Sequence, residues 1–388
     1  MDISIIRDTF KKQFNTSGVV YTSPGRVNLI GEHTDYNMGF VLPGAIDKCM
    51  TLELKPNGGN KCRVYAVDVN QSGEFTIGQS TPPVSLSQGK ENAWLLFFYG
   101  VTEEMRKRGK TIEGFDCVFG GDIPLGGGLS SSAALECAIG FALNETYNLG
   151  FDRYELARIG QLTEHNYLDV KCGIMDQFAS LFGQAGNVIK LDCRSLTFEV
   201  VPFNPKGYRV VLINTMVKHA LGTEYNERVS QCAAGVAAVK TKYPEVASLR
   251  DITEAMLNEV KNICDPLSFQ RSMFVIQENE RLFTACDALK KGDYKTFGQQ
   301  VYGSHTGLSK DYGVSCEELD FLVDQAIKHD ALGARMMGGG FGGCTINFIE
   351  EAKYDAFITT ATEAYEKKYK ITPLVYPVNI SNGTSRIS

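Results

Sequence analysis

The sequence predicts an α+β protein made of two domains. The first half reads as short strands with few helices, whereas the second half has the order βα, a helical insertion, then αββαβ. Without the insertion, the second order is close to a split βαβ, ferredoxin-like arrangement. The chain has 388 residues, enough for two domains with a sizeable core. Two prolines punctuate residues 192–206, so we expect the boundary there and domains over 1–200 and 201–388.

In the first half, three apolar segments predict strands and one predicts a helix. The segments 19–22, 62–67 and 115–119 carry β-branched and aromatic residues, and the last one alternates as a half-buried strand should. A glycine-rich loop follows it and leads into an apolar helix over about 131–147.

The second half predicts alternating strands and helices around an insertion. Strands are expected at 208–213, 334–337, 345–349 and 374–378, and helices at 224–240, across the insertion at about 250–310, and at 351–369. After the insertion, Ser315 and Glu318 form a capping-box pattern. An amphipathic stripe with helical spacing follows them: Leu319, Leu322, Val323, Ala326 and Ile327.

Composition excludes several classes of partner. The 39 basic and 45 acidic residues give a net charge of −6 without a basic block, which argues against nucleic acid or an anionic membrane. The most apolar stretch, 94–98, is too short to span a bilayer, and the charged N-terminus is unlike a signal peptide. Eleven scattered cysteines without a CxxC pair argue against structural zinc. We expect a cytoplasmic monomer.

The stretch 25–37 carries the strongest chemical signal. It places Arg26, Glu32, His33 and Asp35 among glycines, and we expect it to be too polar for the core. Carboxylates accept hydrogen bonds from hydroxyl groups, and a guanidinium holds nearby negative charge, so the cluster suits a neutral polyhydroxy ligand. On the residues alone, a turn with solvated charges is equally consistent.

A second segment, 124–134, predicts a phosphate site. Three glycines allow close backbone approach, and three serines follow at the start of a helix, where backbone N–H groups and the helix dipole attract anions. No lysine follows the glycines, so this is not a Walker A loop. The residues concerned are Gly126, Gly127, Gly128, Leu129, Ser130, Ser131 and Ser132. A flexible hinge with a serine N-cap remains an alternative.

Two further segments contribute to the pattern. The glycine-rich stretch 338–343 is either a wide β-hairpin turn or a loop that closes over the same ligand. In the segment 172–177, Asp176 follows two apolar residues. A partly desolvated carboxylate of that kind needs a cation or a hydroxyl partner, although Asp176 could also simply cap a helix.

Together, these segments resemble the GHMP small-molecule kinases and, within them, the galactokinases. The stretch 25–37 is similar to the galactokinase signature, 124–134 to the GHMP phosphate loop, and 338–343 to the closing motif of the family. The segments 172–177 and 223–225 also match galactokinases. The resemblance implies a GHMP kinase fold, with an N-terminal domain like the second domain of ribosomal protein S5 and a C-terminal ferredoxin-like domain.

The function implied by this resemblance is ATP-dependent phosphorylation of D-galactose at the anomeric C1 hydroxyl. The products would be galactose 1-phosphate and ADP, in the first step of galactose catabolism (the Leloir pathway). A kinase for another galacto-configured sugar, such as N-acetylgalactosamine, is one alternative. A non-catalytic galactose and ATP sensor is another, but such sensors can lack a Ser-Ala pair that is present here as Ser132 and Ala133.

The resemblance also implies roles for individual residues. Asp176 would accept the proton of the anomeric hydroxyl, and Arg26 would keep Asp176 ionised and stabilise the transferring phosphoryl group. Ser132 and Glu164 would bind Mg²⁺. Five residues would hold the sugar: Glu32, His33, Asp35, Gly173 and Tyr225. Backbone groups of 126–132 would cradle the ATP phosphates. Trp94 or Tyr99 could stack on adenine or belong to the core.

Overall fold

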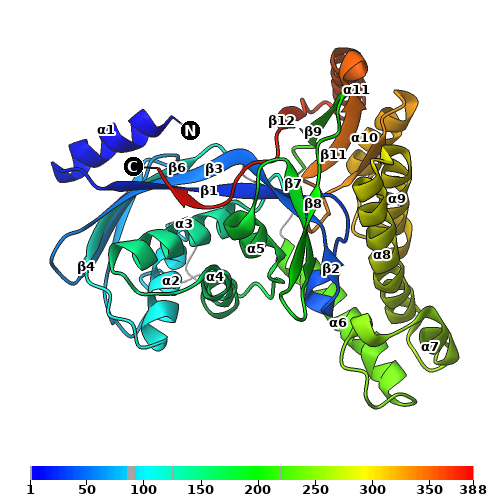
Figure 1. Cartoon of the computed structure of the whole chain (residues 1–388), viewed down its shortest axis with the longest axis horizontal. Helices are drawn as coiled ribbons and strands as arrows, with labels where there is room; N and C mark the ends of the chain where they lie inside the picture. Colours follow the sequence, from blue (N-terminus) through cyan, green and yellow to red (C-terminus); the bar gives the residue numbers. More distant parts are fainter. Residues whose placement is uncertain (1, 85–91, 125, 218–220, 388) are drawn as a thin grey trace.

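The computed structural model describes residues 2–84, 92–124, 126–217 and 221–387. The N-terminal part is built on a six-stranded mixed sheet with the strand order β13-β1-β3-β6-β4-β5 (Figure 1). Its strands are β1 (Val19–Asn28), β3 (Pro43–Pro56), β4 (Lys61–Ala66), β5 (Gln71–Thr76), β6 (Phe115–Gly121) and β13 (Ser385–Arg386). The strands predicted at 19–22, 62–67 and 115–119 are confirmed, and the first continues into the polar stretch 25–37.

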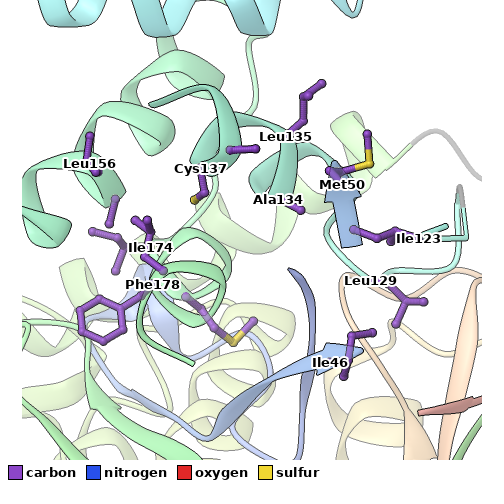
Figure 2. Packing of buried hydrophobic residues seen from close by; sticks show 14 of the residues in the cluster. Ile46, Met50, Ile123, Leu129, Ala134, Leu135, Cys137, Leu156, Ile174 and Phe178 are labelled. Atoms are coloured by element: carbon purple, nitrogen blue, oxygen red, sulfur yellow. The ribbon is translucent and has the colours of Figure 1, made fainter. Parts of the chain in front are cut away.

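Helices cover both faces of this sheet. On one face lie α2 (Leu95–Lys107), α3 (Ser131–Thr146), α4 (Arg153–Tyr167) and α5 (Met175–Phe182), and on the other lies α1 (Ile3–Phe14) (Figure 1). The apolar helix predicted over 131–147 is confirmed as α3. Its side chains pack with those of α5 and with Ile46 and Met50 of β3 (Figure 2).

The prediction that 115–119 is half-buried is wrong. Strand β6 is buried along almost its whole length. The reason is α1, because Val118 packs against Ile6 and Phe10 of that helix on the face that the alternation assigned to solvent.

The C-terminal part confirms the predicted ferredoxin-like order. Its antiparallel sheet has the order β10-β11-β9-β12 and consists of β9 (Tyr208–Asn214), β10 (Gly333–Met336), β11 (Cys344–Glu350) and β12 (Leu374–Val378). Helices α10 (Glu317–Lys328) and α11 (Tyr354–Tyr369) pack on it. Helix α6 (Leu221–Lys240) follows β9, as predicted. The helical insertion comprises α7 (Glu254–Glu259), α8 (Pro266–Lys291), α9 (Tyr294–Thr306) and a π-helical turn, η4 (Gly307–Tyr312).

Two details predicted for α10 are wrong. The N-cap is Cys316, without a side-chain capping bond, because the hydroxyl of Ser315 donates to Asp320 Oδ1 (2.5 Å) instead. The apolar stripe is narrower than its spacing suggests, since Ile327 is 52% exposed while the other four members are buried.

A small third sheet and the chain end link the two parts. The third sheet joins β2 (Phe40–Val41), β7 (Asn187–Asp192) and β8 (Phe198–Pro202), so a strand lies within the expected boundary region 192–206. Strand β13 pairs with β1, which returns the end of the chain to the N-terminal sheet. The division at residue 200 stays a proposal. In the described part of the chain, no helix combines the length and apolarity needed to cross a membrane.

Candidate active site

A cavity of about 410 Å³ brings the four predicted segments together. It is lined from the end of β1, the loop before α3, helices α4 to α6, and the loop between β10 and β11. The predicted site residues that line it are Arg26, Glu32, His33, Asp35, Gly126, Gly128, Leu129, Ser130, Ser131, Ser132, Glu164, Gly173, Asp176 and Tyr225. Gly127 is in the same loop but faces Cys344, since a Cβ there would lie 3.3 Å from the cysteine sulfur. Leu125 lies outside the described residues.

Arg26 and Asp176 form a bidentate ion pair in this cavity. Arg26 Nε lies 2.8 Å from Asp176 Oδ1, and Nη2 lies 2.9 Å from Oδ2. The hydroxyl of Ser130 also donates to Oδ2. The interpretation of Asp176 as a helix cap is wrong, because the N-cap of α5 is Ile174. Burial alone would lower the pKa of Arg26, but the carboxylates of Asp176, Glu32 and Asp35 together outweigh it and raise this pKa.

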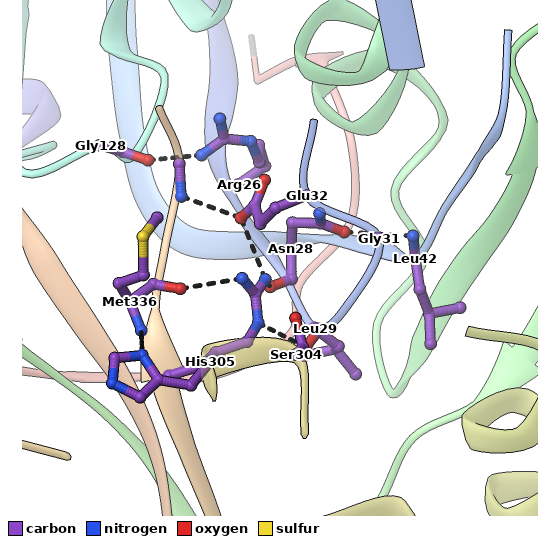
Figure 3. Close-up of polar contacts among 12 residues, drawn as sticks. Arg26, Asn28, Leu29, Gly31, Glu32, Leu42, Gly128, Ser304, His305 and Met336 are labelled. Atoms are coloured by element: carbon purple, nitrogen blue, oxygen red, sulfur yellow. Dashed lines mark hydrogen bonds and ion pairs between the residues drawn. The ribbon is translucent and has the colours of Figure 1, made fainter. Parts of the chain in front are cut away.

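Arg26 also ties this pair to the loop before α3. Its Nη1 donates to the carbonyl of Gly128 (2.5 Å), and its backbone N–H donates to the carbonyl of Leu129 (3.1 Å) (Figure 3). Ser130 stands at the N-cap position of α3, as the alternative interpretation predicts, but its side chain makes no capping bond. The backbone has positive φ at Gly126 (71°) and Gly128 (73°), where glycine is favoured, and at Ser130 (59°).

The closing loop lies against the phosphate loop. A Cβ on Gly128 would be 3.2 Å from the carbonyl oxygen of Met337, and one on Gly343 would be 3.5 Å from that of Gly126. The stretch 338–343 is a hairpin connection between β10 and β11, and Gly338 and Gly339 also line the cavity. The hairpin interpretation is therefore confirmed, whereas closure of this loop over the ligand stays a prediction.

The expectation that 25–37 is too polar for the core is wrong. Arg26 is 4% exposed, Glu32 2% and His33 4%. Buried charges need partners, and here the partners come from distant parts of the chain. The interpretation as a turn with solvated charges is therefore wrong as well.

Glu32 is held by a buried arginine that the sequence analysis missed. Arg335, in β10, is fully buried, and its Nη2 donates to Glu32 Oε1 (3.0 Å). The backbone N–H of Gly338 donates to the same oxygen (2.9 Å). Arg335 also donates to carbonyls at the end of β1 and in β10, at Leu29 (2.9 Å) and Met336 (2.8 Å) (Figure 3). In the sequence, Arg335 could have been recognised as an arginine between apolar residues beside a glycine-rich loop.

His33 lines the cavity, and its two ring nitrogens have different surroundings. Its Nδ1 lies 2.8 Å from the hydroxyl of Tyr36, whereas Nε2 is buried, and the imidazole also has a hydrogen-bond contribution from the backbone of Gly339. Burial, and secondly the charge of Arg228, lower the pKa of His33 to about 3. A neutral imidazole fits the expected role of hydrogen-bond partner rather than general base. The ring of Tyr225 packs against the His33 ring, with the two centroids 5.7 Å apart.

Asp35 and Gly173 are in contact. A Cβ on Gly173 would lie only 1.9 Å from Asp35 Oδ2, so this close packing requires glycine. Burial, and secondly the charge of Asp176, raise the pKa of Asp35 to about 7. The two carboxylates thus repel each other across the cavity, and a ligand that donates hydrogen bonds to Asp35 would relieve that repulsion.

Replacing Gly173 with alanine is expected to raise the KM for the substrate bound in this cavity by about ten- to a hundredfold, because the new methyl group displaces the Asp35 carboxylate. Steady-state kinetics measures the effect. The control is Gly59→Ala, where the nearest atom to the new Cβ would be Asn57 Oδ1 at 3.4 Å. Equal KM values for both variants would show that this packing does not shape the pocket.

Glu164 and Ser132 offer ligands for a hard cation. Glu164, on α4, is 7% exposed, and burial raises its pKa, although hydrogen bonds from Cys172 and Ser132 oppose this. A buried carboxylate beside a hydroxyl at the start of α3 matches the oxygen ligands that Mg²⁺ prefers. No group of three or more His, Cys, Asp or Glu side chains that could hold a metal ion by itself occurs in the described ranges. Phosphate oxygens and water would have to complete such a site.

Neither aromatic residue considered for adenine lines the cavity. Tyr99 belongs to the core and packs against Phe75, with ring centroids 5.7 Å apart, whereas Trp94 is partly buried and packs against Phe119 at 5.3 Å. Phe97, one turn along the same helix, lines the cavity instead. Four further residues that line the cavity were not predicted from the sequence: Leu168, Asp169, Val170 and Asn226.

Comparisons with known proteins agree over the whole chain. Three family models match: the galactokinase galactose-binding signature over 8–56, the GHMP kinases N terminal domain over 97–184, and GHMP kinases C terminal over 285–367. A galactokinase of Roseiflexus sp. (strain RS-1) is 36% identical, covering 100% of this chain and 98% of its own. A galactokinase of Clostridium acetobutylicum is 37% identical, covering 98% of this chain and 97% of its own.

Solved structures give the same result. The crystal structure of Lactococcus lactis galactokinase complexed with galactose matches with a TM-score of 0.93 and 32% identity, over 99% of this chain and 100% of that one. The mevalonate kinase of Methanococcus jannaschii matches with a TM-score of 0.66 at 17% identity, which shows a shared fold.

Proposed function

The chain belongs to the galactokinase family of GHMP kinases, and on this basis we propose that it phosphorylates D-galactose at the anomeric C1 hydroxyl. ATP is the phosphoryl donor, and the products are galactose 1-phosphate and ADP. The predicted two-domain GHMP kinase fold is confirmed. The observation that carries the proposal is the Arg26–Asp176 pair, which stands between the sugar signature and the phosphate loop in one cavity. The related structure that contains galactose supports this substrate over N-acetylgalactosamine or a sensor role.

In the proposed reaction, Asp176 orients the anomeric hydroxyl and accepts its proton as the oxygen attacks the γ-phosphorus of ATP. Arg26 holds Asp176 in its ionised form through two hydrogen bonds and adds positive charge near the transferring group. Phosphoryl transfer through a loose transition state depends mainly on positioning and electrostatics. The bidentate pair supplies both, because it fixes the carboxylate in one orientation.

For the sugar, we propose a pocket made of acceptors on one side and an aromatic ring on the other. Glu32 and Asp35 accept hydrogen bonds from hydroxyl groups, and His33 contributes its imidazole. Gly173 leaves room for Asp35, and Tyr225 completes the pocket.

For ATP, we propose that backbone groups of 126–132 cradle the phosphates at the start of α3. Ser132 and Glu164 would hold Mg²⁺ there. When bound, Mg²⁺ neutralises charge on the phosphate oxygens. Glu164 suits this role because its buried carboxylate forms no salt bridge with a lysine or an arginine within the described ranges.

Glu164→Gln is expected to raise the Mg²⁺ concentration needed for half-maximal activity by at least about tenfold, since even an outer-shell partner contributes about 10- to 100-fold to metal affinity. A magnesium titration at saturating galactose measures this. The matched control is Glu145→Gln, an exposed position on α3. An unchanged magnesium requirement in Glu164→Gln would contradict the assignment.

Asp35→Asn is expected to change how stability depends on pH. The pKa of Asp35 is about 7 in the fold, against 3.8 for the free side chain. The folded chain therefore binds a proton more tightly than the unfolded chain between these values, and the wild type loses stability as pH rises through this window. The Tm of Asp35→Asn relative to wild type should be higher at pH 8 than at pH 5. A Tm difference that stays constant, or shrinks with pH, would refute this.

The proposed function is tested with a panel of sugars, Mg²⁺ and ATP, with ADP release as the readout. D-galactose should be the preferred substrate, and EDTA should stop the reaction. Preference for N-acetylgalactosamine would replace the proposed substrate. ADP release from none of the sugars would overturn the proposal altogether.

A further inference from the structure

A chain of hydroxyl groups extends from His33 away from the cavity. The Tyr36 hydroxyl lies 2.8 Å from His33 Nδ1 and 2.7 Å from the hydroxyl of Tyr312, and the Tyr312 hydroxyl lies 3.2 Å from Cys232 Sγ. Tyr36 and Tyr312 are not among the described residues that line the cavity. Their hydroxyl groups are connected to the cavity lining through His33, and the Tyr36 ring also packs against the lining residue Tyr225, with ring centroids 5.2 Å apart.

The far end of this chain of hydroxyl groups, at Tyr312, is buried and held by hydrogen bonds to its backbone. Tyr312 is fully buried and ends the π-helical turn η4, and such turns occur often at functional sites. Arg228 donates to the carbonyls of Tyr312 (3.0 Å) and Gly313 (2.8 Å), which fixes the backbone that carries the ring. The helical insertion thus reaches the sugar pocket from behind.

The near end of the chain reaches the wall of the cavity. His33 is 4% exposed and lines the cavity, and its Nε2 is buried. A hydrogen bond with the backbone of Gly339, another lining residue, acts to raise the pKa of His33 against the effect of burial. A backbone acceptor of this kind favours a ring nitrogen that carries a proton.

The chemistry of the chain decides which nitrogen of His33 carries the proton. In a neutral imidazole one nitrogen donates and the other accepts. An unprotonated imidazole nitrogen is a stronger acceptor than a phenol oxygen, so the Tyr36 hydroxyl donates to Nδ1. The oxygen of Tyr36 can then accept from Tyr312, whose own oxygen remains within reach of the Cys232 thiol.

We propose that Tyr36 and Tyr312 are positioning residues that hold His33 in the tautomer protonated at Nε2, so that this lining residue offers a hydrogen-bond donor rather than an acceptor in the wall of the cavity. The effect of this tautomer on catalysis rests on the proposed function, whereas the presence of the tautomer does not depend on that function. Tyr36 and Tyr312 would then determine which sugars bind well, although neither touches the substrate.

The tautomer is tested on the full chain without ligand, by NMR of protein labelled with ¹⁵N-histidine. The chain has five histidines, and His33→Gln identifies the signals of His33. In the wild type, Nε2 should resonate as a protonated nitrogen and Nδ1 as an unprotonated one. In Tyr36→Phe, which keeps the ring but removes the hydroxyl, this distinction should be reduced. A proton on Nδ1 in the wild type, or unchanged signals in Tyr36→Phe, would overturn the proposal.

The effect on substrate is tested by kinetics. Tyr36→Phe should raise the galactose KM by about tenfold and leave kcat nearly unchanged. Tyr302→Phe is the control, because it removes a comparable hydroxyl, one that donates to the Ala331 carbonyl (2.9 Å). Combined with His33→Ala, Tyr36→Phe should cause no further loss.

If Tyr36→Phe raised the galactose KM by the same factor in the wild type and in His33→Ala, the effect of Tyr36 could not act through His33. Absence of galactose turnover in the wild type would instead count against the proposed function, and the NMR result would still decide the tautomer.

Discussion

Replacing Asp176 with asparagine is expected to lower kcat by about 10²- to 10⁴-fold, which is the usual contribution of a positioned acid–base group. The variant keeps the shape of the side chain but loses the charge that accepts the proton and pairs with Arg26. Galactose affinity should change little, because the other groups proposed to hold the sugar remain. Steady-state turnover and calorimetric titration with galactose measure the two effects separately.

The matched control is Asp116→Asn. Asp116 makes a similar bidentate pair with Arg63, at 2.7 Å for both contacts, far from the cavity lining. That variant should keep its kcat. Near-normal kcat in Asp176→Asn, or an equal loss in both variants, would remove Asp176 from its proposed role.

Replacing Arg335 with methionine is expected to destabilise the fold by about 3–5 kcal/mol, as is usual when one member of a buried ion pair is removed. Among the described contacts, the Glu32 carboxylate would keep only the bond from the Gly338 N–H to Oε1, and the backbone carbonyls of Asn28, Leu29 and Met336 would lose their donor. Urea denaturation measures the free energy of unfolding. The galactose KM should also rise, because Arg335 fixes the orientation of Glu32.

Arg209→Met is the control for this experiment. Arg209 pairs with Glu351 on the surface, where an ion pair contributes little to stability. If Arg335→Met were no less stable than this control, the buried network would have no structural importance. If Arg335→Met were less stable but bound galactose normally, the coupling between Arg335 and Glu32 would be irrelevant to the sugar.

The elements that the sequence predicted well are those whose pattern is local. The strands β9 and β12 and the helices α3 and α11 each carry a periodic apolar pattern within a few turns or residues, and all four are present. The short strand β13 is two residues long and has no such pattern, so its pairing with β1 could not be anticipated. The burial of β6 depends on α1, which was not among the predicted elements.

The site could be predicted as a set of residues but not as a network. Chemistry and family resemblance identified the polar groups that line the cavity. Their partners lie far away in sequence: Asp176 is 150 positions from Arg26, Arg335 is 303 from Glu32, and Tyr312 is 276 from Tyr36. Because no local pattern marks such pairs, the burial of 25–37 was predicted wrongly, and the supporting residues were missed.

The position of the phosphate in the product tests the central claim most directly. After incubation with galactose, ATP and Mg²⁺, ³¹P NMR should show a sugar phosphate whose phosphorus couples to the anomeric proton, formed in step with ADP. Coupling to the protons of the terminal carbon instead, or the absence of any phosphorylated sugar, would contradict the account.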